Sequence, residues 1–147
     1  MLVIHDLAEV IVGDIPAFAH DKRINKYQNE QAAMHRLVSN LPGRTATEFL
    51  DLWEEMEAKQ SNEAKLAQSI DKLEVLIQHI IADISTWGDG DYSLGPYNKD
   101  DYFDFNPYLR ALKDHVNEMF WTKMDAENKL DRLQPEHLAR RAKESEK

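Results

Sequence analysis

The sequence contains no cysteine among its 147 residues. This absence excludes a disulfide scaffold, a thiolate metal site and a cysteine nucleophile. It is compatible with a reducing cytosol, and we expect a cytoplasmic protein. Long apolar runs are also lacking, since none approaches the roughly 20 residues that a helix needs to span a bilayer. We therefore expect no membrane partner.

Basic residues are scarce relative to acidic ones. Lys and Arg together number 18, against 27 for Asp and Glu, which gives a formal net charge of −9. Such a surface repels polyanions, so a role in coating a nucleic-acid polymer is disfavoured. A small phosphorylated substrate is still compatible with this charge, because a bound cation would dominate the local field.

Glycine and proline are few, with five of each, and no stretch alternates between apolar and polar residues as a half-buried strand does. Hydrophobic residues make up 42% of the chain and charged residues 31%, which is typical of a globular protein. The sequence therefore predicts an all-α bundle of five to six helices. We expect one domain over residues 1–133 and a charged carboxy-terminal tail over residues 134–147 that frays.

Five helices are predicted where apolar residues recur at helical spacing between stop signals. They cover residues 1–13, residues 22–40, a segment from residue 47, a long segment capped by Ser61 or Asn62, and a segment from Pro107. Asn106 before Pro107 is typical of a helix start. The segment 87–106 is rich in glycine, aspartate and aromatic residues, and it predicts an ordered loop or lid. Its aspartates do not match the spacing of an EF-hand, so a solvated acidic loop is favoured over a calcium site.

The first predicted helix carries the residues that point to chemistry. His5 and Asp6 are adjacent, and a single ion beside the helix could be reached by both side chains, one from each flank. An imidazole nitrogen with carboxylate oxygens suits several divalent metals, so we expect Co, Mn, Mg, Zn, Fe or Ni. Glu9 shares that face and could orient or deprotonate a water held by the ion. Asp14 at the helix end could reach the same pocket, or it could simply form a turn.

Asp71, on the long fourth helix, is the candidate for a further metal ligand. It lies in an apolar neighbourhood, where a carboxylate is costly to bury unless it is paired or bound to a metal. Pairing with Lys65 or Lys72 is the alternative. Either lysine could hold a phosphate oxygen of a substrate, and His20 could lie at the edge of the pocket. For these three side chains a solvated position is the simpler interpretation.

Two segments resemble known motifs. The run His-Asp-Leu-Ala-Glu-Val-Ile-Val-Gly-Asp-Ile-Pro over residues 5–16 resembles the central motif of the HD-domain superfamily of metal-dependent phosphohydrolases. Residues 63–74, around Asp71, resemble a later motif of the branch of bacterial 5′-deoxynucleotidases and their eukaryotic HD-domain-containing relatives. The resemblance covers about residues 1–78. A bare His-Asp pair carries no signal, whereas the extended run with a matching Asp71 helix is specific.

The resemblance implies an HD-domain helical bundle that holds a divalent metal ion through His5, Asp6 and Asp71. It implies that Glu9 is the catalytic carboxylate near the attacking water, and that Asp14 assists in the same pocket or contacts the nucleoside. The implied reaction is hydrolysis of a deoxynucleoside 5′-monophosphate to deoxynucleoside and phosphate, in a homodimer. Two alternatives stay open: hydrolysis of another nucleotide or phosphate ester, and a non-catalytic helical dimerisation or binding module.

The sequence departs from the family pattern at one ligand. The family holds its metal with His, His-Asp and Asp, and the first His lies on a helix upstream of the His-Asp pair. Here only residues 1–4 precede His5, so we expect that the amino-terminal helices of the family are missing. The remaining site would have three protein ligands, with water or a neighbouring side chain in the other position. An apolar face left uncovered would favour oligomerisation.

Overall fold

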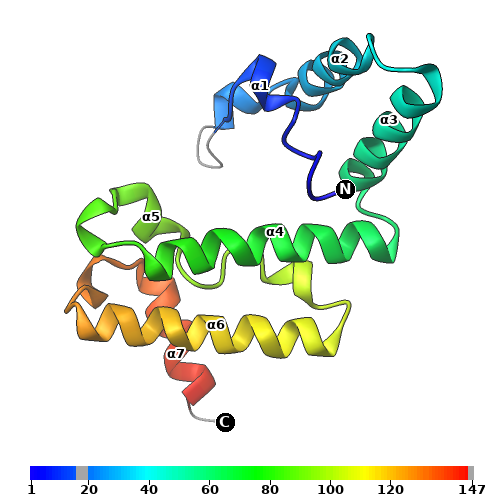
Figure 1. Cartoon of the computed structure of the whole chain (residues 1–147). Coiled ribbons are helices and arrows are strands. Elements are labelled where there is room, and N and C mark those ends of the chain that lie inside the picture. Colours follow the sequence, from blue (N-terminus) through cyan, green and yellow to red (C-terminus); the bar gives the residue numbers. More distant parts are fainter. Residues whose placement is uncertain (16–19, 146–147) are drawn as a thin grey trace. The chain divides into compact units, whose positions relative to one another are not determined.

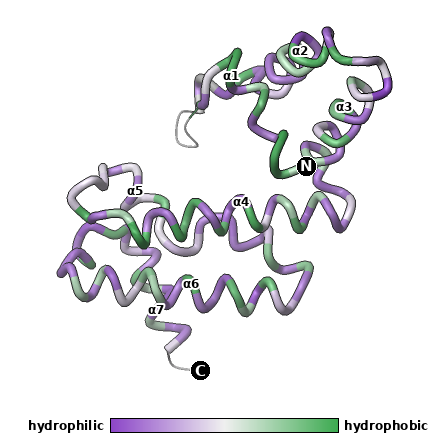
Figure 2. The backbone as a smooth tube through the Cα atoms, in the orientation of Figure 1, coloured by the Kyte–Doolittle hydropathy of each residue, from purple (hydrophilic) through white to green (hydrophobic). Residues whose placement is uncertain are grey.

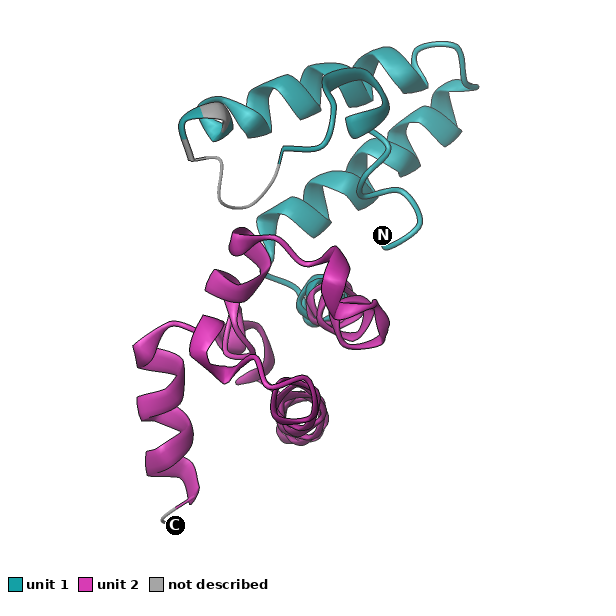
Figure 3. Ribbon diagram, turned by 90° about the vertical axis from the view of Figure 1, so that its left-hand side faces the viewer, with its two compact units in different colours: residues 1–68 teal, residues 69–147 magenta. Residues whose placement is uncertain are grey.

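The computed structural model describes residues 1–15 and 20–145, apart from the side chains of His20 and Lys22. Every regular element in these ranges is helical, so the all-α prediction is confirmed (Figure 1). None of the described helices is long and apolar enough to cross a membrane. The chain divides into two compact units, residues 1–68 and residues 69–147 (Figure 3).

The first unit places a short helix against a pair of longer ones. Its elements are α1 (Glu9–Val12), the 3₁₀ helix η1 (His20–Arg23), α2 (Lys26–Val38), α3 (Gly43–Ala58) and the beginning of α4 (Asn62–Ile81). α2 contacts both α1 and α3. One cluster of its buried core consists of Ala8, Ala33, Met34 and Trp53. Ala8, which directly precedes α1, is fully buried in this core. Its packing therefore fixes the position of the motif at residues 5–16.

Residues 1–13 do not form the single helix that the sequence predicts. Residues 2–8 form successive turns, and only α1 is α-helical. An α-helix would offer the Leu2 carbonyl to the backbone N–H of Asp6, but this carbonyl instead accepts from the His5 ring at 2.6 Å. The predicted stop at Gly13 is confirmed, since Gly13 has a φ of 80°, which favours glycine. His5 and Asp6 therefore lie in a turn.

The starts of the other long helices follow local signals. α2 begins at Lys26, later than predicted, because Asn25 before it is left-handed with a φ of 65°. α3 begins at Gly43, directly after a proline and earlier than predicted. The predicted caps are confirmed: the Ser61 hydroxyl accepts from the backbone N–H of Ala64 at 3.1 Å. Asn106 likewise accepts from two backbone N–H groups at the start of α6 (Pro107–Ala126).

The second unit has its core between α6 and the part of α4 beyond residue 68, which run side by side (Figures 1 and 3). Hydrophobic positions recur along both helices (Figure 2). The buried cluster comprises Leu73, Leu76, Trp87, Tyr92, Phe103, Val116, Phe120, Trp121, Met124 and Leu133. The long fourth predicted helix thus contributes Leu73 and Leu76 to this core.

The segment 87–106 is more regular than the predicted loop. It contains α5 (Asp89–Leu94) and the 3₁₀ helix η3 (Asp100–Phe103), which the sequence analysis does not predict. That the segment is ordered is confirmed, since Tyr92 and Phe103 are buried in the core. A role as a lid stays a prediction.

The expectation that the carboxy-terminal tail frays is wrong up to Ser145. After the 3₁₀ helix η4 (Leu130–Arg132), residues form α7 (Pro135–Ser145). Arg140 pairs with Asp100 of η3, and Arg141 pairs with Asp125 at 3.0 Å. These ion pairs stabilise α7. Because they join residues that are far apart in the sequence, a local sequence pattern does not reveal them. That residues 1–133 form one domain stays a prediction.

Candidate metal centre

His5 and Asp6 turn their side chains toward each other. The Nε2 atom of His5 lies 3.1 Å from Oδ2 of Asp6. Nδ1, on the other side of the ring, lies 2.6 Å from the carbonyl oxygen of Leu2 and therefore donates its proton there. In a neutral ring Nε2 then carries a lone pair that faces a carboxylate. Two electron-pair donors at this distance need a proton or a cation to stabilise them.

Glu9 opens α1 and is partly buried, with 22% of its side chain exposed. Its carboxylate lies 3.5 Å from the ammonium of Lys26 on α2, which also lies 2.5 Å from Glu30. Burial raises the pKa of Glu9, as do the negative charges of Asp6, Asp14 and Glu30, while Lys26 opposes these effects. A carboxylate with a raised pKa is a stronger base than an ordinary carboxylate, which suits it to accept a proton.

Asp14 follows Gly13 and is exposed. Its charge acts on Glu9 strongly enough to raise the pKa of that carboxyl group. The structure thus brings Asp6 and Asp14 into electrostatic range of Glu9, and His5 contacts Asp6. These four residues are the ones that the motif at residues 5–16 contributes to the predicted site.

The other predicted site residues belong to α4 and η1. Asp71 belongs to the second unit, and its Oδ2 lies 2.5 Å from Nζ of Lys72, so pairing with this lysine, which the sequence left open, is present. Lys65 is partly buried on α4. The His20 side chain lies outside the described residues. It stays a prediction that Asp71 shares an ion with His5. It also stays a prediction that Lys65, Lys72 or His20 contacts the substrate.

Sequence reasoning missed Lys26 and Glu30. The two residues are four positions apart on α2, which is the spacing of a helical ion pair. That spacing could have indicated their mutual contact. No sequence pattern links Lys26 to Glu9, because they are joined only when α1 packs on α2.

The HD domain family matches residues 1–112, a range that contains every predicted site residue. This chain belongs to the HD-domain family. Among curated relatives, the 5′-deoxynucleotidase HDDC2 of Xenopus laevis is 40% identical over 78 residues, which are 53% of this chain and 39% of that protein. The protein of the same name from Homo sapiens is 36% identical over 78 residues, covering 53% of this chain and 38% of that protein.

A third relative in the HD-domain family is the 5′-deoxynucleotidase hdd1 of Schizosaccharomyces pombe. It is 35% identical over 80 residues, which are 52% of this chain and 40% of that protein. The chain therefore spans less than half the length of these curated relatives. No solved structure matches the chain significantly.

HD-domain hydrolases are metal-dependent, and membership of the family supports a divalent metal in this chain. His5 and Asp6 fit such an ion as two donors, because metal-bound histidines usually donate their other ring N–H to a carbonyl or carboxylate. Within residues 1–15 and 20–145, no group of three or more His, Asp or Glu side chains is placed to hold a metal ion. The fit is therefore that of a partial ligand set.

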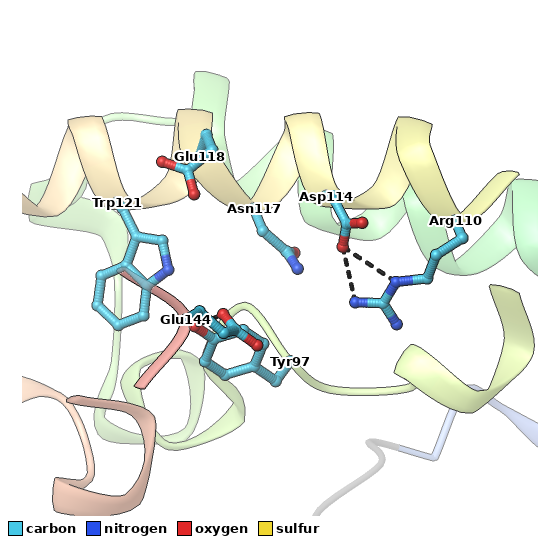
Figure 4. A pocket seen from close by; sticks show the side chains of 7 residues that line it. All are labelled: Tyr97, Arg110, Asp114, Asn117, Glu118, Trp121 and Glu144. Atoms are coloured by element: carbon cyan, nitrogen blue, oxygen red, sulfur yellow. Dashed lines mark hydrogen bonds and ion pairs between the residues drawn. The ribbon is translucent and has the colours of Figure 1, made fainter. Parts of the chain in front are cut away.

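The second unit contains a cavity of about 310 Å³. It is lined by Tyr97, Arg110, Asp114, Asn117, Glu118, Trp121 and Glu144, and by none of the predicted site residues (Figure 4). The Arg110 guanidinium bonds to the carboxylates of Asp100, Asp104 and Asp114. Because these carboxylates neutralise the cation, the cavity offers no phosphate site comparable to the one expected beside a metal.

Proposed function

We propose that this HD-domain chain carries part of a metal-dependent phosphohydrolase that converts deoxynucleoside 5′-monophosphates to deoxynucleoside and phosphate. The observation that carries the proposal is the His5–Asp6 pair, whose ring is oriented by the Leu2 carbonyl so that Nε2 faces the Asp6 carboxylate. The names of the relatives, each a 5′-deoxynucleotidase, support the substrate class.

In this proposal His5, Asp6 and Asp71 hold a divalent ion, with Co, Mn, Mg, Zn, Fe and Ni as candidates. When bound, such an ion supplies Lewis acidity toward the phosphate and lowers the pKa of water. Glu9 takes the proton from the attacking water, since its partly buried carboxyl group has a raised pKa.

The remaining predicted residues handle the substrate. Asp14 follows the glycine that ends α1, and its exposed carboxylate is free to face the nucleoside. Lys65 and Lys72 are candidates for phosphate contacts, because an ammonium acts as a point charge on phosphate oxygens. His20, in η1, is the candidate for the edge of the pocket.

We also propose that the protein acts as a homodimer in the cytoplasm. Tyr108, Leu112 and Met119 lie on one stripe of α6 and are exposed by 86%, 45% and 42%. An exposed apolar stripe of this kind marks a protein interface. Light scattering of the purified chain tests this part, and a monomer at micromolar concentration contradicts it.

A non-catalytic helical module is the second candidate. It is favoured by the finding that the described residues contain no complete group of three metal-binding side chains. Such a module would bind a partner through its helices and release no phosphate from any nucleotide.

One experiment separates these candidates. Phosphate release is measured from a panel of deoxynucleoside and ribonucleoside monophosphates with added Co, Mn or Zn, together with elemental analysis of the purified chain. The proposal is supported if deoxynucleotides release phosphate and if Asp71→Ala abolishes both this release and the bound metal. Glu74→Gln, an exposed carboxylate on the same helix, is the matched control. If phosphate is released only from other phosphate esters, the substrate belongs to another class. If no phosphate is released and no metal is bound, the non-catalytic helical module is supported.

A further inference from the structure

We infer that Lys26 is a positioning residue that holds the Glu9 carboxylate in place, and that buried Glu30 is the anchor that holds Lys26. The inference rests on the proposed function for its catalytic meaning. It concerns a contact between α1 and α2, at the amino-terminal end of each helix.

Glu30 and Lys26 form the fixed part of this arrangement. Glu30 is 5% exposed, and its carboxylate lies 2.5 Å from the Lys26 ammonium, four residues earlier on α2. Moving the ammonium away would leave a buried carboxylate without its counter-charge, which is strongly unfavourable. The lysine, normally a mobile side chain, therefore has one favoured position.

From that position Lys26 reaches across to the catalytic motif. Its ammonium lies 3.5 Å from Glu9, and 23% of the lysine side chain is exposed. Burial alone lowers the pKa of Lys26, but its close ion pair with Glu30 and the charge of Glu9 raise it above its ordinary value. The Lys26 ammonium is thus charged at every pH at which the proposed reaction is expected to proceed.

Glu9 needs an external partner, because the other charges around it are repulsive. Asp6 and Asp14 lie on its own segment and Glu30 on α2, and all three are carboxylates. Among the largest influences on the pKa of Glu9 in the described part of the chain, Lys26 is the cation, and Arg23 of η1 acts on Lys26. Without Lys26, repulsion and hydration would favour a Glu9 rotamer directed to solvent.

The kinetic test compares Lys26→Met with Lys26→Arg. Loss of the ammonium is expected to lower kcat by about 10–100-fold, as for other residues that orient a reacting group. KM and the metal content should be unchanged, and Lys26→Arg should keep most of the activity because it keeps the charge. Arg44→Met, which breaks an exposed ion pair of the same spacing on α3, is the control and should leave kcat unchanged.

Some kinetic results would overturn the inference. An unchanged kcat in Lys26→Met does so, as does a loss of metal, since Lys26 would then act on the ligands and not on Glu9. If Lys26→Met fails to fold, Glu30→Gln provides the same test, with a smaller fall in kcat expected because the ammonium remains but loses its anchor.

A second measurement does not depend on turnover. Acetic anhydride labelling followed by mass spectrometry compares Lys26 with exposed Lys143 in the same chain. Lys26 should react several-fold more slowly, and Glu30→Gln and Glu9→Gln should each speed its reaction. Equal reactivity of Lys26 and Lys143 in the wild type would overturn the inference. If the wild type releases no phosphate while Lys26 is protected in this way, the proposed function fails but the ion-paired arrangement stands.

Discussion

The imidazole of His5 donates from Nδ1 to the Leu2 carbonyl oxygen, three residues earlier, across 2.6 Å. This bond fixes both the tautomer and the direction of the ring. The electron pair of Nε2 is then presented beside Asp6, which lies 3.1 Å away. The proposed metal ligand is thus oriented by the backbone of the turn that leads into the motif at residues 5–16.

Metal binding is expected to depend on that ring. His5→Gln removes the Nε2 donor, and the affinity for divalent metal should fall by at least about tenfold. His35→Gln, at an exposed position on α2, removes a histidine without touching the motif and should bind as the wild type does. Elemental analysis after dialysis measures both, and equal metal in the two variants would remove His5 from the ligand set.

The second unit should depend on Asp100. Its carboxylate lies 3.0 Å from the ammonium of Lys113, which is 1% exposed, and it also pairs with Arg110 and Arg140. Asp100→Asn leaves the buried ammonium without its counter-charge, so unfolding should become easier by about 3–5 kcal/mol. Urea denaturation measures the change.

Asp104→Asn is the matched control for Asp100→Asn. Asp104 is 67% exposed and pairs with Arg110 at 3.3 Å. An exposed pair of this kind contributes about 0–1 kcal/mol. If both substitutions destabilise the protein equally, the buried cluster around Lys113 is not the source of the stability.

Acid should weaken the second unit through the same carboxylate. Burial alone raises the pKa of Asp100, but Lys113, Arg110 and Arg140 lower it below its ordinary value of 3.8. In the unfolded chain Asp100 takes up its proton near that ordinary value, while the folded chain does so only at lower pH. The stability that Asp100 contributes is therefore complete above about pH 4 and is lost as pH falls through the lowered pKa.

The measurement compares wild type and Asp100→Asn by denaturation at pH 6 and pH 3. The difference in stability between them should be smaller at pH 3, because the wild-type carboxylate then loses its advantage over the amide. A difference that is the same at both pH values would mean that Asp100 titrates normally in the folded chain.

The start of α6 should depend on Asn106, whose side chain accepts from the backbone N–H groups of Tyr108 and Leu109 at 2.9 and 3.3 Å. Asn106→Ala leaves these donors without a protein partner and should cost about 1 kcal/mol. Asn106→Asp keeps an acceptor and should be nearly neutral. Thermal denaturation distinguishes the two, and an equally large loss with Asp would point to a role other than capping.

Local signals account for what could be predicted from the sequence. The caps at Ser61 and Asn106 and the stop at Gly13 each rest on a backbone requirement that one residue type meets.

Long-range contacts account for what could not be predicted. α7 is ordered by Asp100 and Asp125, which lie on other elements, and α5 is stabilised because Tyr92 is buried against distant residues of the core. Lys26 was missed for the same reason, because its partner Glu9 is on another helix. No window of neighbouring residues contains these pairs.

The docking of α7 gives the protein a built-in optical reporter. The guanidinium of Arg141 lies 4.6 Å from the centre of the Trp121 ring, and that of Arg140 lies 3.9 Å from the Tyr97 ring. A cation so close to an indole shifts its fluorescence, so release of the carboxy-terminal helix would change the emission of Trp121. Detachment of that helix, by salt or by a ligand, could then be followed in solution without any added label.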